Sequence, residues 1–421
     1  MKLDVVDASI EYISNGWYRC SVVVSGSISS VRIIGAIGNN DTNTNGEYCY
    51  IQDAMFNQGM VSYPYLETTT APVAGGILED MPRLDYSNGS CPSLLLEPSR
   101  TNLIEYSEYF EAGWTAASAS VTSNSEISPE GLQNASTITD LSSSVLQNLL
   151  YDSNISSGKT YTYSIFLKKD EDENRFPEFS INMRFGTSVV DCYMQVNTRT
   201  GEKLVRISNG TITTDVQDFS DDYWRVLIIA TNTDNTEVRA SIRPAATTTF
   251  GAAENSATGS IVVYGFQIEE GSYPTSYIPT YGVSQTRLQD SATASVTNTT
   301  SRTYFLGGKR LADEDVNNSS PIYNATGALR ITYWTDNRFR FRFNNDSNYY
   351  TLVGDDFKIA VSYNGIDSKV FINGSYWITK TLDLGNLSTI DIVGNESISY
   401  NQTLLFPTAL SDEACIELTT I

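Results

Sequence analysis

The sequence feature that most limits the possible folds is a repeat of strand-like segments. One copy lies near the start of the chain and the other lies past its middle. In the first copy apolar side chains occupy every second position of residues 18–24, and residues 31–33 continue this period of two. In the second copy residues 224–229 form an apolar run and residues 238–242 alternate. A period of two is typical of β-strands that bury one face. We therefore expect an all-β fold.

Three landmarks align the two copies: Arg19 with Arg225, Phe56 with Phe266, and Pro64 with Pro274. The offsets are 225 − 19 = 206, 266 − 56 = 210 and 274 − 64 = 210, and the drift of four falls in Asn/Thr/Gly-rich loops, which tolerate insertions. The second copy has a front half, residues 100–215, and the first copy has none. Half a sandwich exposes strand edges and one apolar face. We expect a neighbouring copy, another subunit or another protein to complete residues 1–75.

Residues 81–110, between the copies, form a seam rich in turn residues. Pro82, Pro92 and Pro98 each remove a backbone donor, so no long helix crosses the seam, and the leucines at 94–96 are expected to be buried. The segment PRLDYSNGSCPSLLLEPSRTNLIEYSEYF, with Trp114 after it and EEGSYPTSYIPT at 269–280, resembles a segment that recurs in bacteriophage tail-fibre and other virion surface proteins. There it is similar to the opening of a jelly-roll module of the carbohydrate-binding-module type. The resemblance covers residues 1–290 and implies modules of that kind.

A third unit follows a Ser/Thr-rich connector at 281–300. Residues 329–333 alternate, and at 338–343 phenylalanines alternate with arginines. The pair KIAVSYNG (358–365) and KVFING (369–374) resembles two neighbouring strands of the concanavalin A-like, or laminin G-like, sandwich. Ser411 is a good N-cap, and Asp412 and Glu413 suit the first turn of a helix that continues through 414–418.

The expected architecture is a series of tandem antiparallel β-sandwich modules of the jelly-roll type, the first one incomplete. Residues 1–80 form a half sandwich, residues 81–285 a complete jelly roll similar to carbohydrate-binding modules, and residues 286–421 a concanavalin A-like sandwich with a short C-terminal helix. In the complete module we expect a half-buried strand at 160–167, Trp114 in the core, and hairpin turns at 197–201 and 209–210.

Composition excludes several functions. The formal net charge is −22, from 49 acidic and 27 basic residues, whereas nucleic-acid binding needs a basic face. The same charge disfavours an anionic membrane surface. The chain has no histidine, so Ser-His-Asp and Cys-His catalytic groups and His-based zinc sites are impossible within one chain. Only 18% of residues are charged and 26 are tyrosine, which is typical of all-β surface proteins.

The five cysteines are expected to be scattered, buried thiols and not a disulfide framework. They include no CxxC pair and are odd in number. They are Cys20, Cys49, Cys91, Cys192 and Cys415. The sequence shows no signal-peptide pattern and no apolar run long enough to span a bilayer, so we expect no membrane insertion.

Aromatic side chains are the expected ligand contacts, because sugars stack their apolar faces on Trp and Tyr. The candidates lie on the third unit and are Trp334, Tyr349, Tyr350, Tyr376 and Trp377. Packing in the core or between subunits is the alternative for each one. The arginines at 338, 340 and 342 share one strand face, where they could meet an acidic polysaccharide or pair with carboxylates of the chain itself.

Acidic residues supply weaker candidates. Asp170–Glu173 and Asp313–Asp315 could bind calcium through carboxylate oxygens, but neither run has the ligand spacing of a defined calcium loop. Solvated charged tips are the simpler interpretation, so we expect no metal and no cofactor, with calcium as a weak possibility. Paired carboxylates could cleave glycosides, but no motif singles out a pair, and we expect no catalytic residue.

The sequence therefore predicts a non-enzymatic phage virion component, part of a tail fibre or a capsid fibre, that attaches to host-surface polysaccharide. We expect a homotrimer on the virion surface that also contacts other virion proteins. One alternative is a structural or decoration protein without a ligand. Another is a depolymerase that cuts surface polysaccharide.

Overall fold

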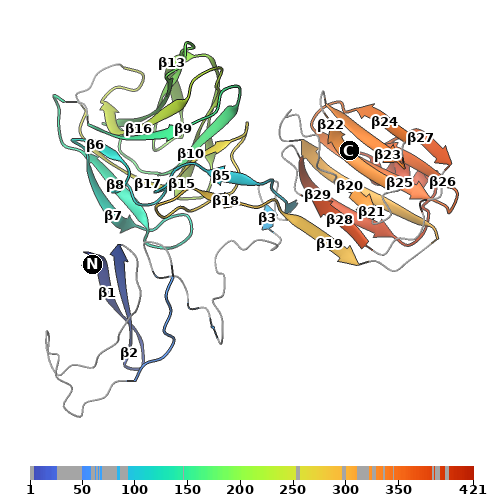
Figure 1. Ribbon diagram of the computed structural model, residues 1–421, viewed down its shortest axis with the longest axis horizontal. Coiled ribbons are helices and arrows are strands. Elements are labelled where there is room, and N and C mark those ends of the chain that lie inside the picture. The colour runs from blue at the N-terminus through green and yellow to red at the C-terminus, as the bar shows by residue number, and fades with distance from the viewer. Residues whose placement is uncertain are drawn as a thin grey trace.

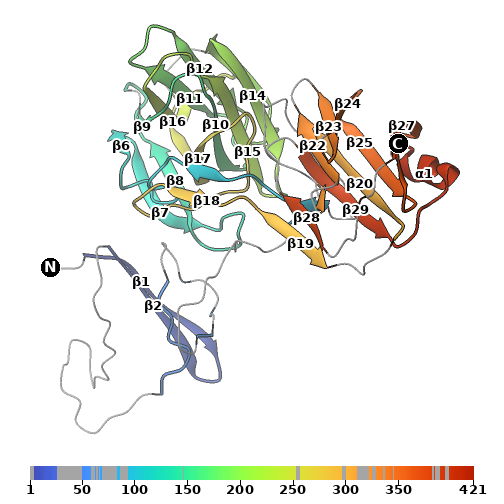
Figure 2. The ribbon, with the colours of Figure 1, turned by 45° about the vertical axis from the view of Figure 1, so that its right-hand side comes forward.

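The chain folds almost entirely as antiparallel β-sheet, as expected. The computed structural model describes residues 4–25, 50–57, 62, 65, 67–68, 83–85, 93–145, 147–252, 257–295, 300–310, 322–324, 329–334, 337–344, 346–381, 384, 389–393 and 398–421. Within these ranges one helix accompanies the strands, and the strands of every sheet pair in the antiparallel sense. Figures 1 and 2 show a central sandwich in green and yellow, a C-terminal sandwich in orange and red, and a hairpin in blue.

The central sandwich consists of two six-stranded sheets. The first has the order β14-β15-β10-β17-β8-β7 and contains β7 (Ser120–Glu126), β8 (Ala135–Asp140), β10 (Thr160–Lys168), β14 (Thr211–Asp218), β15 (Tyr223–Thr231) and β17 (Gly259–Glu270). The second has the order β13-β12-β11-β16-β9-β6 and contains β6 (Thr115–Ala117), β9 (Asn148–Asn154), β11 (Phe176–Arg184), β12 (Val190–Val196), β13 (Lys203–Asn209) and β16 (Glu237–Thr247). Alternate side chains of both sheets form one core, and Trp114 lies in it, as predicted.

Two local expectations for this sandwich have different outcomes. The turn at Asn197–Gly201 joins β12 and β13, which pair, so this hairpin is confirmed. The hairpin predicted at Asn209–Gly210 is wrong, because β13 pairs with β12 in one sheet and β14 pairs with β15 in the other. The turn residues mark a change of chain direction, but they do not determine which sheet the next strand enters.

The strand predicted to be half-buried at 160–167 is β10, and it is buried on both faces. Thr162 and Ser164, which point away from the main core, are 0% and 1% exposed. Residues after β17 fold back over this outer face, where Thr162 donates to the carbonyl of Gly271. Tyr277 packs against Phe166 in a second, smaller core on the same face. The outer face of β10 is thus covered by the chain itself.

The C-terminal sandwich also has two sheets. One has the order β19-β28-β21-β22-β23-β24 and contains β19 (Ser291–Ser295), β21 (Ile322–Asn324), β22 (Leu329–Trp334), β23 (Arg338–Phe343), β24 (Asp346–Thr351) and β28 (Thr389–Val393). The other has the order β27-β26-β25-β20-β29-β4-β3 and contains β3 (Arg83–Asp85), β4 (Ser93–Leu95), β20 (Arg302–Arg310), β25 (Asp356–Tyr363), β26 (Asp367–Ile372), β27 (Ser375–Thr381) and β29 (Ile398–Phe406). The predicted neighbours 358–365 and 369–374 are β25 and β26, which pair antiparallel.

The C-terminal helix forms where the sequence predicts it. Helix α1 spans Asp412–Thr419, and the Ser411 hydroxyl accepts a hydrogen bond from the Ala414 amide at 3.2 Å. Cys415 packs with Phe305 and Phe371 on the outer face of the β20–β25–β26 part of the sheet. The helix therefore covers this face and keeps its aromatic side chains from water.

The seam belongs partly to the C-terminal sandwich. Strands β3 and β4 pair with each other, β4 continues the sheet next to β29, and Leu96 is buried in the C-terminal core. Leu96 is thus buried as expected, but against residues more than two hundred positions away, and Leu95 is half-buried. After it, β5 (Arg100–Asn102) pairs with β18 (Gln285–Arg287) beside the central sandwich. The boundaries at 80/81 and 285/286 stay predictions, and strands 83–95 lie with the later unit.

Strands β1 (Asp4–Ser14) and β2 (Trp17–Ser25) form the hairpin near the N-terminus. It stands clear of both sandwiches in Figures 1 and 2. Cys192 and Cys415 are buried free thiols, as predicted. For Cys20 on β2 the prediction of burial is wrong, because no second sheet in the described part of the chain covers the hairpin and the thiol is exposed. Cys49 and Cys91 lie outside the described residues. No helix in the described ranges is long and apolar enough to cross a membrane.

Candidate functional site

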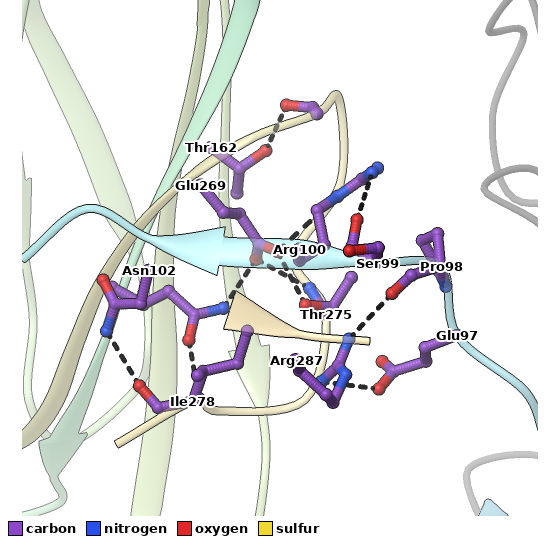
Figure 3. A network of polar contacts seen from close by, with 12 residues as sticks. Glu97, Pro98, Ser99, Arg100, Asn102, Thr162, Glu269, Thr275, Ile278 and Arg287 are labelled. Atoms are coloured by element: carbon purple, nitrogen blue, oxygen red, sulfur yellow. Dashed lines mark hydrogen bonds and ion pairs between the residues drawn. The ribbon is translucent and has the colours of Figure 1, made fainter. Parts of the chain in front are cut away.

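The residues that carry the phage resemblance form a buried polar clasp, shown in Figure 3. The Arg100 guanidinium lies 3.7 Å from the carboxylate of Glu269, which also accepts hydrogen bonds from the amide and hydroxyl of Thr275 at 2.8 and 2.6 Å. Arg287 contacts Glu97 at 3.0 Å. Glu269 is 0% exposed, and charges this deeply buried are tolerated only when they are paired and hydrogen-bonded.

Two further residues of the motif serve the same clasp. The fully buried Asn102 donates to the carbonyls of Phe266 and Ile278 and accepts from the amides of Ile104 and Ile268. Gly271 has φ +149°, and a Cβ there would lie 2.6 Å from the Arg100 guanidinium. The motif therefore ties residues 97–102 to residues 266–290. Its polar groups face one another, which indicates a structural role.

A different surface has the properties of a binding site. On β9, β11, β12 and β16 one set of alternate side chains enters the core, and the other set points outward from the sheet that contains β13. We call this outward surface the Tyr193 face. Its residues are Asn148, Leu150, Asp152, Glu178, Ser180, Asn182, Tyr193, Arg239, Ser241 and Arg243.

The centre of the Tyr193 face is a row of small side chains between larger ones. Strand register places Tyr193 opposite Ser180, Ser180 opposite Ser241, and Ser241 opposite Leu150. The two serines are 5% and 6% exposed, although they point away from the core. The neighbouring side chains are longer and cover the two serines, which form the floor of this row, and the half-buried Tyr193 ring lies at one end of it.

Polar groups surround this floor. The Arg243 guanidinium lies 5.8 Å from the centre of the Tyr193 ring and contacts Glu178 at 2.8 Å. The Asn148 amide donates to the Ser241 hydroxyl at 3.2 Å. Among the described residues, the Asn182 amide and the Tyr193 hydroxyl make no hydrogen bond to the protein, so both can bind a ligand.

The charges of the Tyr193 face are held in fixed positions by ion pairs. Arg239 binds Asp152 through two hydrogen bonds of 2.7 Å, and Arg184 lies 3.0 Å from the same carboxylate. The hydrogen bond from Arg239, with the charge of Arg184, lowers the pKa of Asp152 below its ordinary value. Glu178 is held between Arg243 and Arg206, at 2.8 and 2.7 Å. These acids therefore remain engaged by arginines, which suits binding better than proton transfer.

Of the five aromatic residues predicted from the sequence, the four whose side chains the structure describes do not form one surface. Tyr350 and Trp377 pack edge to face at 5.4 Å against the C-terminal core, between edge strands β24 and β27. Tyr349 is 44% exposed on the outer face of β24, and Tyr376 is 52% exposed against Phe371 on the other sheet. Trp334 ends β22, and its side chain lies outside the described residues.

The charged candidates are placed as follows. Phe339, Phe341 and Phe343 enter the C-terminal core, so the alternating arginines share the outer face of β23, and Arg338 lies 5.4 Å from the Tyr349 ring. Asp170 and Asp172 both contact the buried Arg175. No group of three potential metal ligands gathers in the described ranges, and residues 313–315 lie outside them.

One buried acid was not anticipated. Glu108 is 2% exposed and accepts hydrogen bonds from the hydroxyls of Tyr264, Tyr277 and Tyr281 at 3.2–3.3 Å. Burial, and the nearby charge of Glu130, raise the pKa of Glu108 to about 7. Because a ligand cannot reach it, this group acts on stability and has no place in the binding site.

Sequence reasoning missed the Tyr193 face, although part of its signal was present. In the strand around Cys192 the positions that alternate with apolar residues hold Asp191, Tyr193 and Gln195. An aromatic residue between polar ones on an outward strand face is a ligand-type pattern. The serine floor cannot be found in this way, because it requires the register of strands more than forty residues apart.

Comparisons with known proteins add the following. A scan against protein-family models gives no match, and a search of curated proteins gives no similar sequence. A search of solved structures gives a Trypanosoma rangeli sialidase in complex with sialic acid, with 10% sequence identity and a TM-score of 0.24. That match covers 68% of this chain and 65% of the sialidase chain. A likeness this weak carries no conclusion about activity.

Proposed function

We propose that the chain is a non-enzymatic phage virion component, of a tail or capsid fibre, which attaches to host-surface polysaccharide through the Tyr193 face. One observation supports this binding site. The Tyr193 ring lies at the end of the serine floor, with Asn182 and the paired arginine and acidic side chains around it. Flat sugar rings fit such a surface, since their C–H faces stack on aromatics and their hydroxyls bond to amides and ions. The phage assignment rests on the resemblance of the seam, as does the expected homotrimer.

The experiment is a glycan array with the purified full chain, followed by titration of the best ligand. Tyr193→Ala should weaken binding about tenfold or more, because a lost ring contact of about 1.4 kcal/mol corresponds to a factor of ten. Tyr349→Ala, which removes a similar side chain from the C-terminal sandwich, is the matched control. If Tyr349→Ala abolishes binding and Tyr193→Ala does not, the site lies among the residues first predicted.

The two alternatives give different results in the same experiment. A decoration protein would bind no glycan on the array. A depolymerase would shorten the polysaccharide during incubation, and a size-exclusion profile of the polymer would show it. The pairing of Asp152 and Glu178 with arginines supports the expectation that the polymer stays intact.

A further inference from the structure

We propose that the apolar face of the β1–β2 hairpin packs against the same face of another copy of this chain. This face consists of Ala8, Ile10, Tyr12, Tyr18, Cys20 and Val22, which are paired across the two strands. The inference concerns assembly and does not depend on glycan binding.

The hairpin repeats β14–β15 of the central sandwich in register. Ile10 pairs with Cys20 in the hairpin, and Val216 pairs with Val226 in the central sandwich. Val216 follows Ile10 by 216 − 10 = 206 positions, and Val226 follows Cys20 by 226 − 20 = 206 positions. The pair of Tyr12 with Tyr18 corresponds in the same way to residues 218 and 224. The repeat in the sequence is therefore also a repeat of strand pairing, and the equivalent faces can be compared.

The equivalent faces differ in what covers them. In the central sandwich Val226 and Ile228 are 0% exposed, because the opposite sheet covers them. Their counterparts are Cys20, which is exposed, and Val22, which is 62% exposed. Ile10 is 75% exposed. An isolated two-stranded hairpin is marginally stable in water, so this face requires a second apolar layer.

The character of the two hairpin faces favours another copy as that layer. The opposite face carries the polar and charged pairs, with Ser9 bonded to Ser21 at 2.7 Å and Glu11 paired with Arg19 across the strands, alongside Val23 and the exposed Ile13. The apolar face contains no charged residue. A chain with net charge −22 repels its own copies, and an uncharged face allows two copies to approach without opposing charges. Six side chains from each copy bury on the order of 1,000 Å² in total, the size of the smaller specific interfaces.

The test measures the molar mass of the full chain by light scattering across a wide range of protein concentration. We expect the wild type to exceed the 46.4 kDa of one chain by a whole multiple. Ile10→Asp places a charge on the apolar face and should give the mass of one chain. Ser9→Asp places the same charge on the polar face and should leave the wild-type mass unchanged. A wild-type monomer throughout, or an unchanged mass for Ile10→Asp, overturns the proposal.

Labelling of Cys20 provides a second measurement that does not depend on the fold of the Asp variant. The thiol lies in the middle of the apolar face, between the Tyr12–Tyr18 pair and the Ala8–Val22 pair. In the associated wild type it should react slowly with a thiol reagent, and dilution should speed the reaction. The Cys20→Ser variant shows which part of the labelling reaction comes from Cys20, since the other described thiols are buried. A reaction rate that does not change with dilution contradicts contact between copies.

Discussion

Replacing Glu108 by Gln should remove a specific pH dependence of stability. The carboxyl is buried among three tyrosine hydroxyls and the Asn134 amide, and among the described residues no cation contacts it. The unfavourable burial of its charge outweighs these hydrogen bonds and raises its pKa from the ordinary 4.5 to about 7. Glutamine has the shape of the protonated acid and no charge at any pH.

The sign and size of the effect follow from the two pKa values. Between them the folded protein keeps the Glu108 proton and the unfolded chain releases it. The stabilisation is fully present below pH 4.5 and is lost as the pH rises through 7. The difference of 7 − 4.5 = 2.5, at about 1.4 kcal/mol for each pH unit, amounts to about 3 kcal/mol. The variant should match the wild type near pH 4.5 and exceed its stability by about this amount well above pH 7.

The assay is urea unfolding of the full chain at a series of pH values, with wild type and variant compared at each one. The transition of the central sandwich is the one that should move, because Glu108 lies in it. Glu171→Gln, which removes an exposed carboxyl of the same unit, is the control and should follow the wild type. If Glu108→Gln keeps the wild-type slope between pH 5 and pH 8, the reasoning is refuted.

Five further substitutions test the packing and one helix cap. Gly265→Ala, at φ +62° with rings 3.1–3.2 Å from the new Cβ, should cost about 2–4 kcal/mol, whereas Gly131→Ala, at φ +79° in open space, should cost about 1–2 kcal/mol in the same unfolding assay. Trp377→Ala should destabilise the C-terminal sandwich by about 2–4 kcal/mol and Tyr349→Ala by less than about 1 kcal/mol, measured by thermal unfolding. Ser411→Ala should cost about 1 kcal/mol and raise hydrogen exchange in helix α1.

Local pattern was sufficient for much of the C-terminal sandwich. The alternation at 338–343 placed every phenylalanine in the core, because one face of β23 is buried and the other is not. The cap at Ser411 likewise located helix α1, since the hydroxyl, the acids of the first turn and the helix amides are neighbours in the sequence. These features depend on residues within one element.

Features that depend on pairing between distant strands could not be predicted. Tyr193, Ser180 and Ser241 are neighbours only because β12, β11 and β16 pair in one particular register. A shift of one residue would send these side chains into the core. The aromatic candidates at 349–350 and 376–377 show the same limit, because exposure on an edge strand depends on the sheet that faces it.

The clasp is related to the proposed binding surface because the segment that it holds covers the outer face of β10, on the opposite side of the central sandwich. Asn102 and Glu269 hold the segments before and after the module together, and the later segment then crosses the outer face of β10. That face is thereby occupied by Tyr277 and its neighbours. On the other sheet, the Tyr193 face keeps the Asn182 amide and the Tyr193 hydroxyl, which make no hydrogen bond to the described residues. The clasp therefore helps to cover the outer face of β10, and the Tyr193 face on the other sheet is the one that we propose for binding.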